Sequence, residues 1–181
     1  MVSATFEKVK LRPLKAENAF KIFELVNINR TEFGKWLPWV KSTTKVSDTT
    51  QFVKESLRKM RDRTMFVAEI WYFNDLIGLI DLHNINTIHR KASIGYWLCK
   101  TGQGKGIMTY AVKNMVDYGF NEFQLNRIEI LVAEKNSQSI KIPVRLNFKQ
   151  EGVLRESISF DGNLQNMVIY SVLRSEWGGI V

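Results

Sequence analysis

The segment from Gln103 to Thr109 contains the residues best suited to hold a ligand: Gln103, Gly104, Lys105, Gly106, Ile107, Met108 and Thr109. Glycines let a backbone approach a phosphate closely, because they have no Cβ. A helical pattern follows, so the end of the segment should offer the unpaired N–H groups of a first helical turn and the positive end of its dipole. Lys105 adds a full positive charge. This composition predicts a cradle for a pyrophosphate group.

The spacing of the segment excludes two nucleotide-binding motifs. The P-loop requires a glycine, four residues and then Gly-Lys-Ser/Thr, a spacing that is absent here. The dinucleotide fingerprint requires a third glycine where Thr109 stands. Its preceding strand must also open a βαβ unit, whereas here that strand is expected to close an antiparallel set. A glycine-rich turn without a ligand is the alternative at this point.

Other reactive side chains give weaker signals. Cys99 is the only cysteine, and no histidine lies near it in sequence. We therefore interpret it as a small buried residue rather than a nucleophile, and we predict neither an intrachain disulfide nor a metal site. His83 lies in a strand-like run and His89 in a polar connector, where hydrogen bonding or exposure explains each. Glu129 and Glu156 are alternative general bases, and none of the four stands out.

Composition sets the broad class of protein. With 181 residues, of which 45% are hydrophobic, residues 1–181 are expected to form one domain around one core. No apolar run is long enough to cross a bilayer, and Met1–Lys10 lacks the apolar core of a signal peptide. Together with the single cysteine, this predicts a cytoplasmic protein with no membrane partner.

The formal net charge of +8 favours anionic partners: a polyphosphate cofactor, an acidic protein or nucleic acid. Lysines and arginines are scattered and form no basic tail. We therefore predict no specific nucleic-acid binding, and a solvated surface with surplus lysine remains the plainest explanation of the charge.

Hydrophobic periodicity predicts the helices that position the loop. A first helix should span Lys15–Asn29, and a second should start at a Ser47-Asp48 cap. A third should run from the glycine loop to about Phe123, and Asn136 should cap a fourth. The residues expected to face the core are Ala19, Ile22, Phe23 and Val26 in the first, Phe52, Val53, Leu57 and Met60 in the second, and Met108, Ala111, Met115 and Tyr118 in the third.

Strand-like runs alternate with these helices. They cover Phe6–Arg12, Thr64–Phe73, Leu76–Asn84, Lys91–Cys99, Arg127–Val132, Val153–Phe160 and Gln165–Leu173. Asn74-Asp75 and Asp161-Gly162 are expected to turn antiparallel hairpins.

A helical crossover must join Lys91–Cys99 to Arg127–Val132, which implies a parallel pair. The fold class is therefore α/β (α+β), with a mixed, mostly antiparallel central sheet flanked by helices. Because crevices in such sheets lie at the carboxyl ends of strands, Leu98 to Thr109 is the expected site.

Here the chain resembles a known family, the GNAT N-acetyltransferases. The family's loop reads Gln/Arg-x-x-Gly-x-Gly/Ala, and Gln103-x-x-Gly106 matches its first two positions, while Met108 stands where a small residue is preferred. The resemblance to Rim-type ribosomal-protein N-terminal acetyltransferases covers about Leu11 to Trp177. It is carried by Leu11-Arg12-Pro13-Leu14, Asn29-Arg30, Trp36-Leu37-Pro38-Trp39, Ile94-Gly95-Tyr96-Trp97-Leu98, Asn136-x-x-Ser139 and Leu146-Asn147-Phe148.

This resemblance implies roles for individual residues. Backbone groups at Leu98 and Cys99 would hold the pantetheine of acetyl-CoA and polarise its thioester, while Gln103–Thr109 anchors the pyrophosphate. Asn136 would cap its helix and face the pantetheine arm. Many relatives carry a proton-donating tyrosine where Pro143 stands, so Ser139 becomes the implied proton donor. The resemblance also implies a left-handed turn at Asn147, which asparagine tolerates in place of the family's glycine.

The resemblance implies an acetyltransferase in which an amine attacks acetyl-CoA directly, most plausibly the N-terminal amine of a ribosomal protein. A polyamine or antibiotic-like amine is the alternative acceptor. A non-catalytic acyl-CoA-binding module and a ribosome or nucleic-acid binder are alternatives of another class, and a homodimer is left open. Trp36, Trp39 and Trp97 are equally consistent with an acceptor groove and with ordinary packing.

Overall fold

A seven-stranded sheet is the framework of the computed structural model, which describes residues 6–160 and 162–178. The strands lie in the order β1-β2-β3-β4-β5-β7-β6. Among the described strands, β4 and β5 form the one parallel pair, which confirms the predicted mixed sheet and its crossover. The strands are β1 (Val9–Pro13), β2 (Phe66–Tyr72), β3 (Asp75–Asn86), β4 (Lys91–Leu98), β5 (Arg127–Ala133), β6 (Lys149–Phe160) and β7 (Asn163–Leu173).

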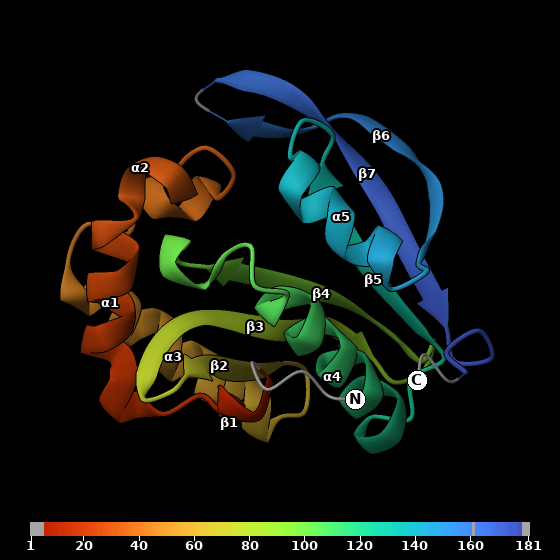
Figure 1. The fold of residues 1–181 in the computed structure, drawn as a ribbon, viewed down its shortest axis with the longest axis horizontal. Coiled ribbons are helices and arrows are strands. Elements are labelled where there is room, and N and C mark those ends of the chain that lie inside the picture. Colours follow the sequence, from red (N-terminus) through yellow and green to blue (C-terminus); the bar gives the residue numbers. More distant parts are fainter. Residues whose placement is uncertain (1–5, 161, 179–181) are drawn as a thin grey trace.

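Helices cover both faces of the first four strands, and a further helix lies over β5 (Figure 1). In β2, Val67 and Trp71 pack with residues of the first and third helices, whereas Ala68 and Ile70 lie in the main core with the fourth. This alternation follows from the two-residue period of a strand. The helices are α1 (Ala19–Ile28), α2 (Arg30–Phe33), α3 (Val46–Arg61), α4 (Ile107–Glu122) and α5 (Ser137–Arg145).

Within the described residues, short 3-10 turns connect these elements: η1 (Phe6–Lys8), η2 (Ala16–Asn18), η3 (Pro38–Lys41) and η4 (Lys100–Gly102). Across the described ranges, no helix has an apolar stretch of the length needed to cross a membrane.

A buried carboxylate fastens α1 to the sheet. Glu69, in β2, is 0% exposed and points to the same layer as Val67 and Trp71. It accepts hydrogen bonds from Asn18 Nδ2 and Trp71 Nε1, each at 2.9 Å, and from the Lys15 backbone N–H at 3.0 Å. A buried charge needs such donors. The network therefore attaches Lys15 and Asn18, which directly precede α1, to β2.

Several predicted boundaries differ from the structure. The first strand begins at Val9 rather than Phe6, because Phe6–Lys8 forms η1. The predicted Lys15–Asn29 helix begins as η2 and becomes α1 at Ala19. In the β2–β3 hairpin Tyr72 pairs with Asp75, so residues 73 and 74 form the turn. Pro13 stays in β1 and pairs with Ala68, which an edge strand tolerates.

The second predicted helix also needs correction. Helix α3 begins at Val46, before the predicted Ser47-Asp48 cap. Asp48 instead reaches back and accepts hydrogen bonds from the backbone N–H groups of Thr44 and Lys45, at 2.9 and 3.0 Å. Phe52 is 40% exposed, so the expected core face was wrong there; Val53 is buried as predicted. For the last hairpin, Phe160 pairs with Asn163, but Asp161 lies outside the described residues.

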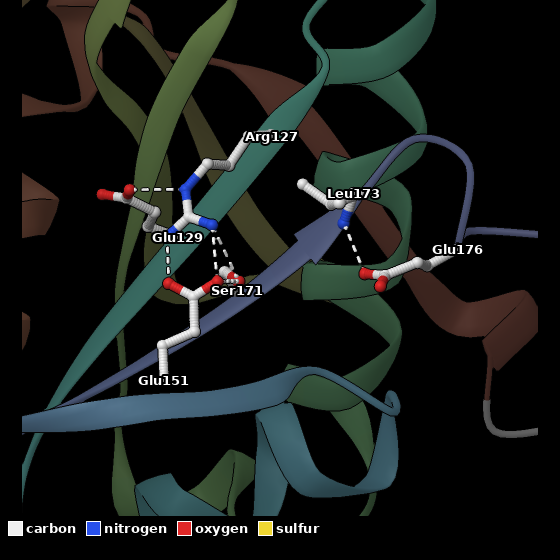
Figure 2. Close-up of polar contacts among 6 residues, drawn as sticks. All are labelled: Arg127, Glu129, Glu151, Ser171, Leu173 and Glu176. Atoms are coloured by element: carbon white, nitrogen blue, oxygen red, sulfur yellow. Dashed lines mark hydrogen bonds and ion pairs between the residues drawn. The ribbon is translucent and has the colours of Figure 1, made fainter.

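An ion-pair network ties β5, β6 and β7 together (Figure 2). Arg127 Nε donates to Glu129 Oε1 at 2.8 Å, and Arg127 Nη1 donates to Glu151 Oε1 at 2.7 Å, while Nη2 donates to the other oxygen of Glu151. Ser171 Oγ also donates to Glu151 at 2.6 Å. The hydrogen bond from Arg127, followed by that from Ser171, lowers the pKa of Glu151 to about 2.

This network predicts a pH-dependent contribution to stability. Because the folded pKa of Glu151 lies below its ordinary value of 4.5, its contribution is present above pH 4.5 and is lost as pH falls toward 2. The loss in unfolding free energy caused by Glu151→Gln should therefore be largest near pH 6 and shrink steadily by pH 3, measured by urea denaturation. Exposed Glu24→Gln is the matched control, and an unchanged Glu151→Gln effect across this range would contradict the assignment.

Candidate active site

The site begins where β4 and β5 separate. Their parallel ladder contains three pairs, from Lys91–Arg127 to Ser93–Glu129. Beyond it, β4 remains paired with β3 through Leu98, while β5 remains paired with β7 through Ala133. The facing edges of the two strands thus leave the ladder, and their backbone polar groups need other partners.

A cleft of about 400 Å³ lies at this separation. Four segments wall it: the α2–η3 region, the end of β4, the glycine loop with the start of α4, and one side of α5. Its lining residues are Glu32, Phe33, Trp36 and Leu37; Tyr96, Trp97 and Leu98; Gly102, Gln103, Gly104, Gly106, Ile107, Met108 and Thr109; and Asn136, Gln138, Ser139, Lys141, Ile142 and Arg145.

The glycine loop has the backbone that its sequence suggested. Gly104 and Gly106 have φ angles of 74° and 75°, in the left-handed region that favours glycine. Gly106 is the N-cap of α4, so the first-turn N–H groups of Ile107, Met108 and Thr109 have no acceptor within the helix. Gln103 Nε2 donates to the Leu98 carbonyl at 3.0 Å, which ties the loop to the end of β4.

The side chains of three residues in this region pack largely against other parts of the protein. Lys105 does not line the cleft, and its Nζ lies 4.9 Å from the centroid of the Tyr72 ring. Cys99 is 4% exposed; its backbone N–H donates to Ile77, and its Sγ shares a 3.0 Å contact with Thr101 Oγ1. Met108 lines the cleft but is only 7% exposed and packs in the core.

The first turn of α5 brings the predicted polar pair together. Asn136 Oδ1 accepts a hydrogen bond from the Ser139 backbone N–H at 3.1 Å, as expected of the helix cap. Pro143 lies inside the helix and is buried. The helix ends at a left-handed Asn147 with φ of 57°, which confirms the predicted turn there.

Tyr96 is a residue of the site that reasoning on single residues missed. Its hydroxyl and Ser139 Oγ share a 2.9 Å hydrogen bond in which either can be the donor, and the hydroxyl also donates to the Ser139 carbonyl at 3.4 Å. Burial raises the pKa of Tyr96 to about 12, although the Ser139 contact acts in the opposite direction. The only sequence signal was its place in the Ile94–Leu98 motif.

Glu32 is the second residue that was missed, and it has the one carboxylate among the described lining residues. Lys35 donates to it at 2.8 Å, which lowers the pKa of Glu32, and Lys100 adds a smaller effect in the same direction. A glutamate three residues before a lysine in a surface turn gives no distinctive sequence signal.

The earlier candidates for a base lie elsewhere. His83 Nδ1 contacts Asp81 Oδ1 at 2.7 Å, and Glu129 pairs with Arg127. Neither lines the cleft, nor do His89 and Glu156.

Aromatic side chains line a further part of the cleft. Trp36 and Trp97 line the cleft, and Trp39 lies behind Trp97 with ring centroids 6.5 Å apart. The Trp36 ring also meets Phe160 edge-on at 6.4 Å, which joins the end of the β6–β7 hairpin to this wall. Two of the three tryptophans therefore border a groove.

Comparison with known proteins identifies the family. Residues 8–149 match the family described as "Acetyltransferase (GNAT) domain". The "Putative ribosomal N-acetyltransferase YdaF" of Bacillus subtilis is 34% identical over 96% of this chain and 95% of its own. The spermidine N(1)-acetyltransferase of Escherichia coli K12 is 29% identical over 93% of this chain and 88% of its own.

A solved structure shares the fold. RimL, described as a ribosomal L7/L12 alpha-N-protein acetyltransferase in complex with coenzyme A, superposes with a TM-score of 0.89 and 22% identity, over 96% of both chains. The glycine loop at the head of α4, the separated strands and the match over residues 8–149 lead to the same conclusion. The chain belongs to the GNAT family and is an acetyl-CoA-dependent N-acetyltransferase.

Proposed function

We propose that this protein acetylates the N-terminal amine of a protein, with a ribosomal protein as the leading candidate, by direct attack on acetyl-CoA in the cytoplasm. The observation that carries the proposal is the cleft itself. It joins a phosphate cradle, an open strand edge, a positioned serine and an aromatic groove within one volume.

The cofactor end of the cleft fits a pyrophosphate and a pantetheine arm. The left-handed glycines bring backbone close to the ligand, and the N-terminus of α4 offers unpaired N–H groups and positive partial charge. Lys141 and Arg145, on the lining side of α5, add positive charge for the phosphates. The free edge at the end of β4 offers backbone groups to the amides of pantetheine, much as a neighbouring strand would.

Ser139 is placed to assist the leaving group. Its backbone is held by Asn136, and its hydroxyl lines the cleft on the α5 side, opposite the end of β4. The acceptor nitrogen attacks the thioester carbon, the C–S bond breaks, and the sulfur takes a proton from the Ser139 hydroxyl. The amine releases its own proton to water, and water restores that of Ser139, so the net transfer is from amine to thiol.

The acceptor end favours an amine with a single positive charge. Glu32 can attract an ammonium group, and the faces of the Trp36 and Trp97 rings can attract the same cation through cation–π interactions. Its lowered pKa keeps Glu32 ionised and makes it a poor base. Because Lys35 pairs with Glu32 and Lys100 lies near, this single carboxylate can attract one positive charge only weakly and the several charges of a polycation less well.

This charge balance supports a protein N-terminus over spermidine. An N-terminal amine has an ordinary pKa near 8, so a useful fraction arrives uncharged without a dedicated base. The name of YdaF supports the same acceptor. Spermidine remains the second candidate, because one relative is named for it and Glu32 faces the groove.

An acceptor comparison tests the function. Acetyl transfer is measured by mass spectrometry on peptides with free N-terminal serine or alanine, on their N-blocked versions, and on spermidine. We expect product on the free peptides, none on the blocked ones, and a kcat/KM for spermidine at least about tenfold lower. Preferred turnover of spermidine would replace the proposed acceptor with the second candidate.

The phosphate cradle predicts a binding defect. Gly106→Val introduces a β-branched side chain at φ of 75°, a backbone conformation that L residues rarely adopt, so the loop should change the conformation proposed to hold the pyrophosphate. The dissociation constant for acetyl-CoA should rise at least about tenfold, roughly 1.4 kcal/mol, by calorimetric titration. Gly152→Val, where a Cβ meets nothing within 4 Å, is the control. Unchanged affinity in a folded Gly106→Val protein would remove the cradle assignment.

The leaving-group role predicts a purely kinetic defect. Ser139→Ala should lower kcat by about 10²-fold while the acetyl-CoA affinity changes little, because the lost interaction strengthens only in the transition state. Ser137→Ala, an exposed serine of the same turn, should behave as wild type. Wild-type turnover by Ser139→Ala would leave water as the proton source.

A further inference from the structure

The hydrogen bond between Tyr96 and Ser139 bridges the gap between β4 and α5. These residues are 43 positions apart in sequence, and both line the cleft. Tyr96 comes from the part of β4 beyond the last pair with β5, where no neighbouring strand holds the other edge. Its hydroxyl is therefore a polar link between the two walls that flank the leaving group in the proposed reaction.

The number of hydrogens available decides what this link can do. Ser139 has one hydroxyl hydrogen, which cannot serve the sulfur while it is donated to Tyr96. Tyr96 also has one, and its two acceptors lie at 2.9 Å for Ser139 Oγ and 3.4 Å for the Ser139 carbonyl. The shorter contact is close to the usual O–H···O length, whereas the longer is weak. Donation from Tyr96 to Oγ gives the tyrosine hydrogen the shorter of these two contacts, and it leaves the serine hydrogen free.

The buried environment of Tyr96 keeps its hydroxyl group protonated. Burial raises its pKa to about 12, so the phenol keeps its proton throughout the physiological range. A phenol that stays protonated always has a hydrogen to donate at working pH. An O–H group that also accepts a hydrogen bond is polarised and becomes a stronger donor itself.

We propose that Tyr96 is a positioning residue for acetyl transfer: its hydroxyl donates to Ser139 Oγ and so directs the serine hydrogen toward the sulfur of bound acetyl-CoA. This inference rests on the proposed role of Ser139. Tyr96 keeps its own proton throughout, and the proton taken by the sulfur is that of Ser139, restored from water. Pro143 gives α5 no hydroxyl at this position, and in the proposed reaction Tyr96 brings a second hydroxyl to Ser139 from β4.

A double-mutant cycle tests the proposal. Wild type, Tyr96→Phe, Ser139→Ala and the double variant are compared by thiol release from acetyl-CoA with a peptide bearing a free N-terminal serine. Tyr96→Phe should lower kcat about tenfold, the effect of one hydrogen bond, with KM for acetyl-CoA unchanged. In the Ser139→Ala background the same change should alter kcat less than about twofold, because its effect passes through Ser139.

Two controls separate positioning from structure. Tyr118→Phe removes the same hydroxyl from a residue of α4 that packs on Phe66 and Phe123 and does not line the cleft, so its kinetics should match wild type. Thermal unfolding and calorimetric titration of acetyl-CoA are measured on every variant. A merely structural tyrosine would lower the melting temperature or the affinity and would reduce kcat equally in both backgrounds.

The outcomes distinguish this inference from the proposed function. Equal losses in both backgrounds, or wild-type kcat in Tyr96→Phe, overturn the positioning role while the acetyltransferase assignment stands. If the peptide is not acetylated, the cycle is run with spermidine, because the Tyr96–Ser139 link concerns the sulfur and not the acceptor. Wild-type kcat in Ser139→Ala overturns both the serine's role and this inference.

Discussion

The separation of β4 from β5 after three parallel pairs is the constraint on which the rest of the site depends. If the two strands had stayed paired, their edges would have satisfied each other and left no room between them. Because they diverge, each strand keeps one paired edge, with β3 and β7 respectively, and the end of β4 lines the cleft through Tyr96, Trp97 and Leu98. Besides its outer edges at β1 and β6, the sheet thus has an internal edge where an amide-containing ligand can complete the ladder. The crossover through α4 then sets the N-terminus of that helix at the same end of the gap.

The charged residues differ between the two sides of the cleft. The cofactor side has Lys141 and Arg145 on α5 and the positive end of α4, which suit a ligand with several phosphates. The opposite side has aromatic walls and Glu32, whose charge Lys35 balances. The net charge of +8 therefore need not imply nucleic acid, since part of it lies where a polyphosphate is expected. Lys105, the most conspicuous cation of the loop sequence, lies instead against Tyr72.

The hydrogen bond between Tyr96 and Ser139 joins the end of β4 to the first turn of α5. Pro143 removes an N–H and a possible phenol from α5, yet the helix keeps its cap at Asn136 and its left-handed end at Asn147. The hydroxyl that meets Ser139 comes from a strand, whose position is set by its ladder with β3 rather than by the helix. Pro143 is thus compatible with an ordered α5 and with the contact between Tyr96 and Ser139.

Much of this protein was determined by local sequence signals. The period of two in strands and of about four in helices gave the order of elements, and the crossover rule gave the parallel pair. Glycine at 104 and 106 and asparagine at 136 and 147 mark positions whose backbone or cap geometry few other residues meet, so those features were predictable. Only the tertiary structure decided where β4 and β5 part, that Tyr96 meets Ser139, that Glu32 borders the groove, and that Lys105 turns away. Such contacts join residues tens of positions apart, and they depend on how whole layers pack, for which a single sequence carries no periodic signal.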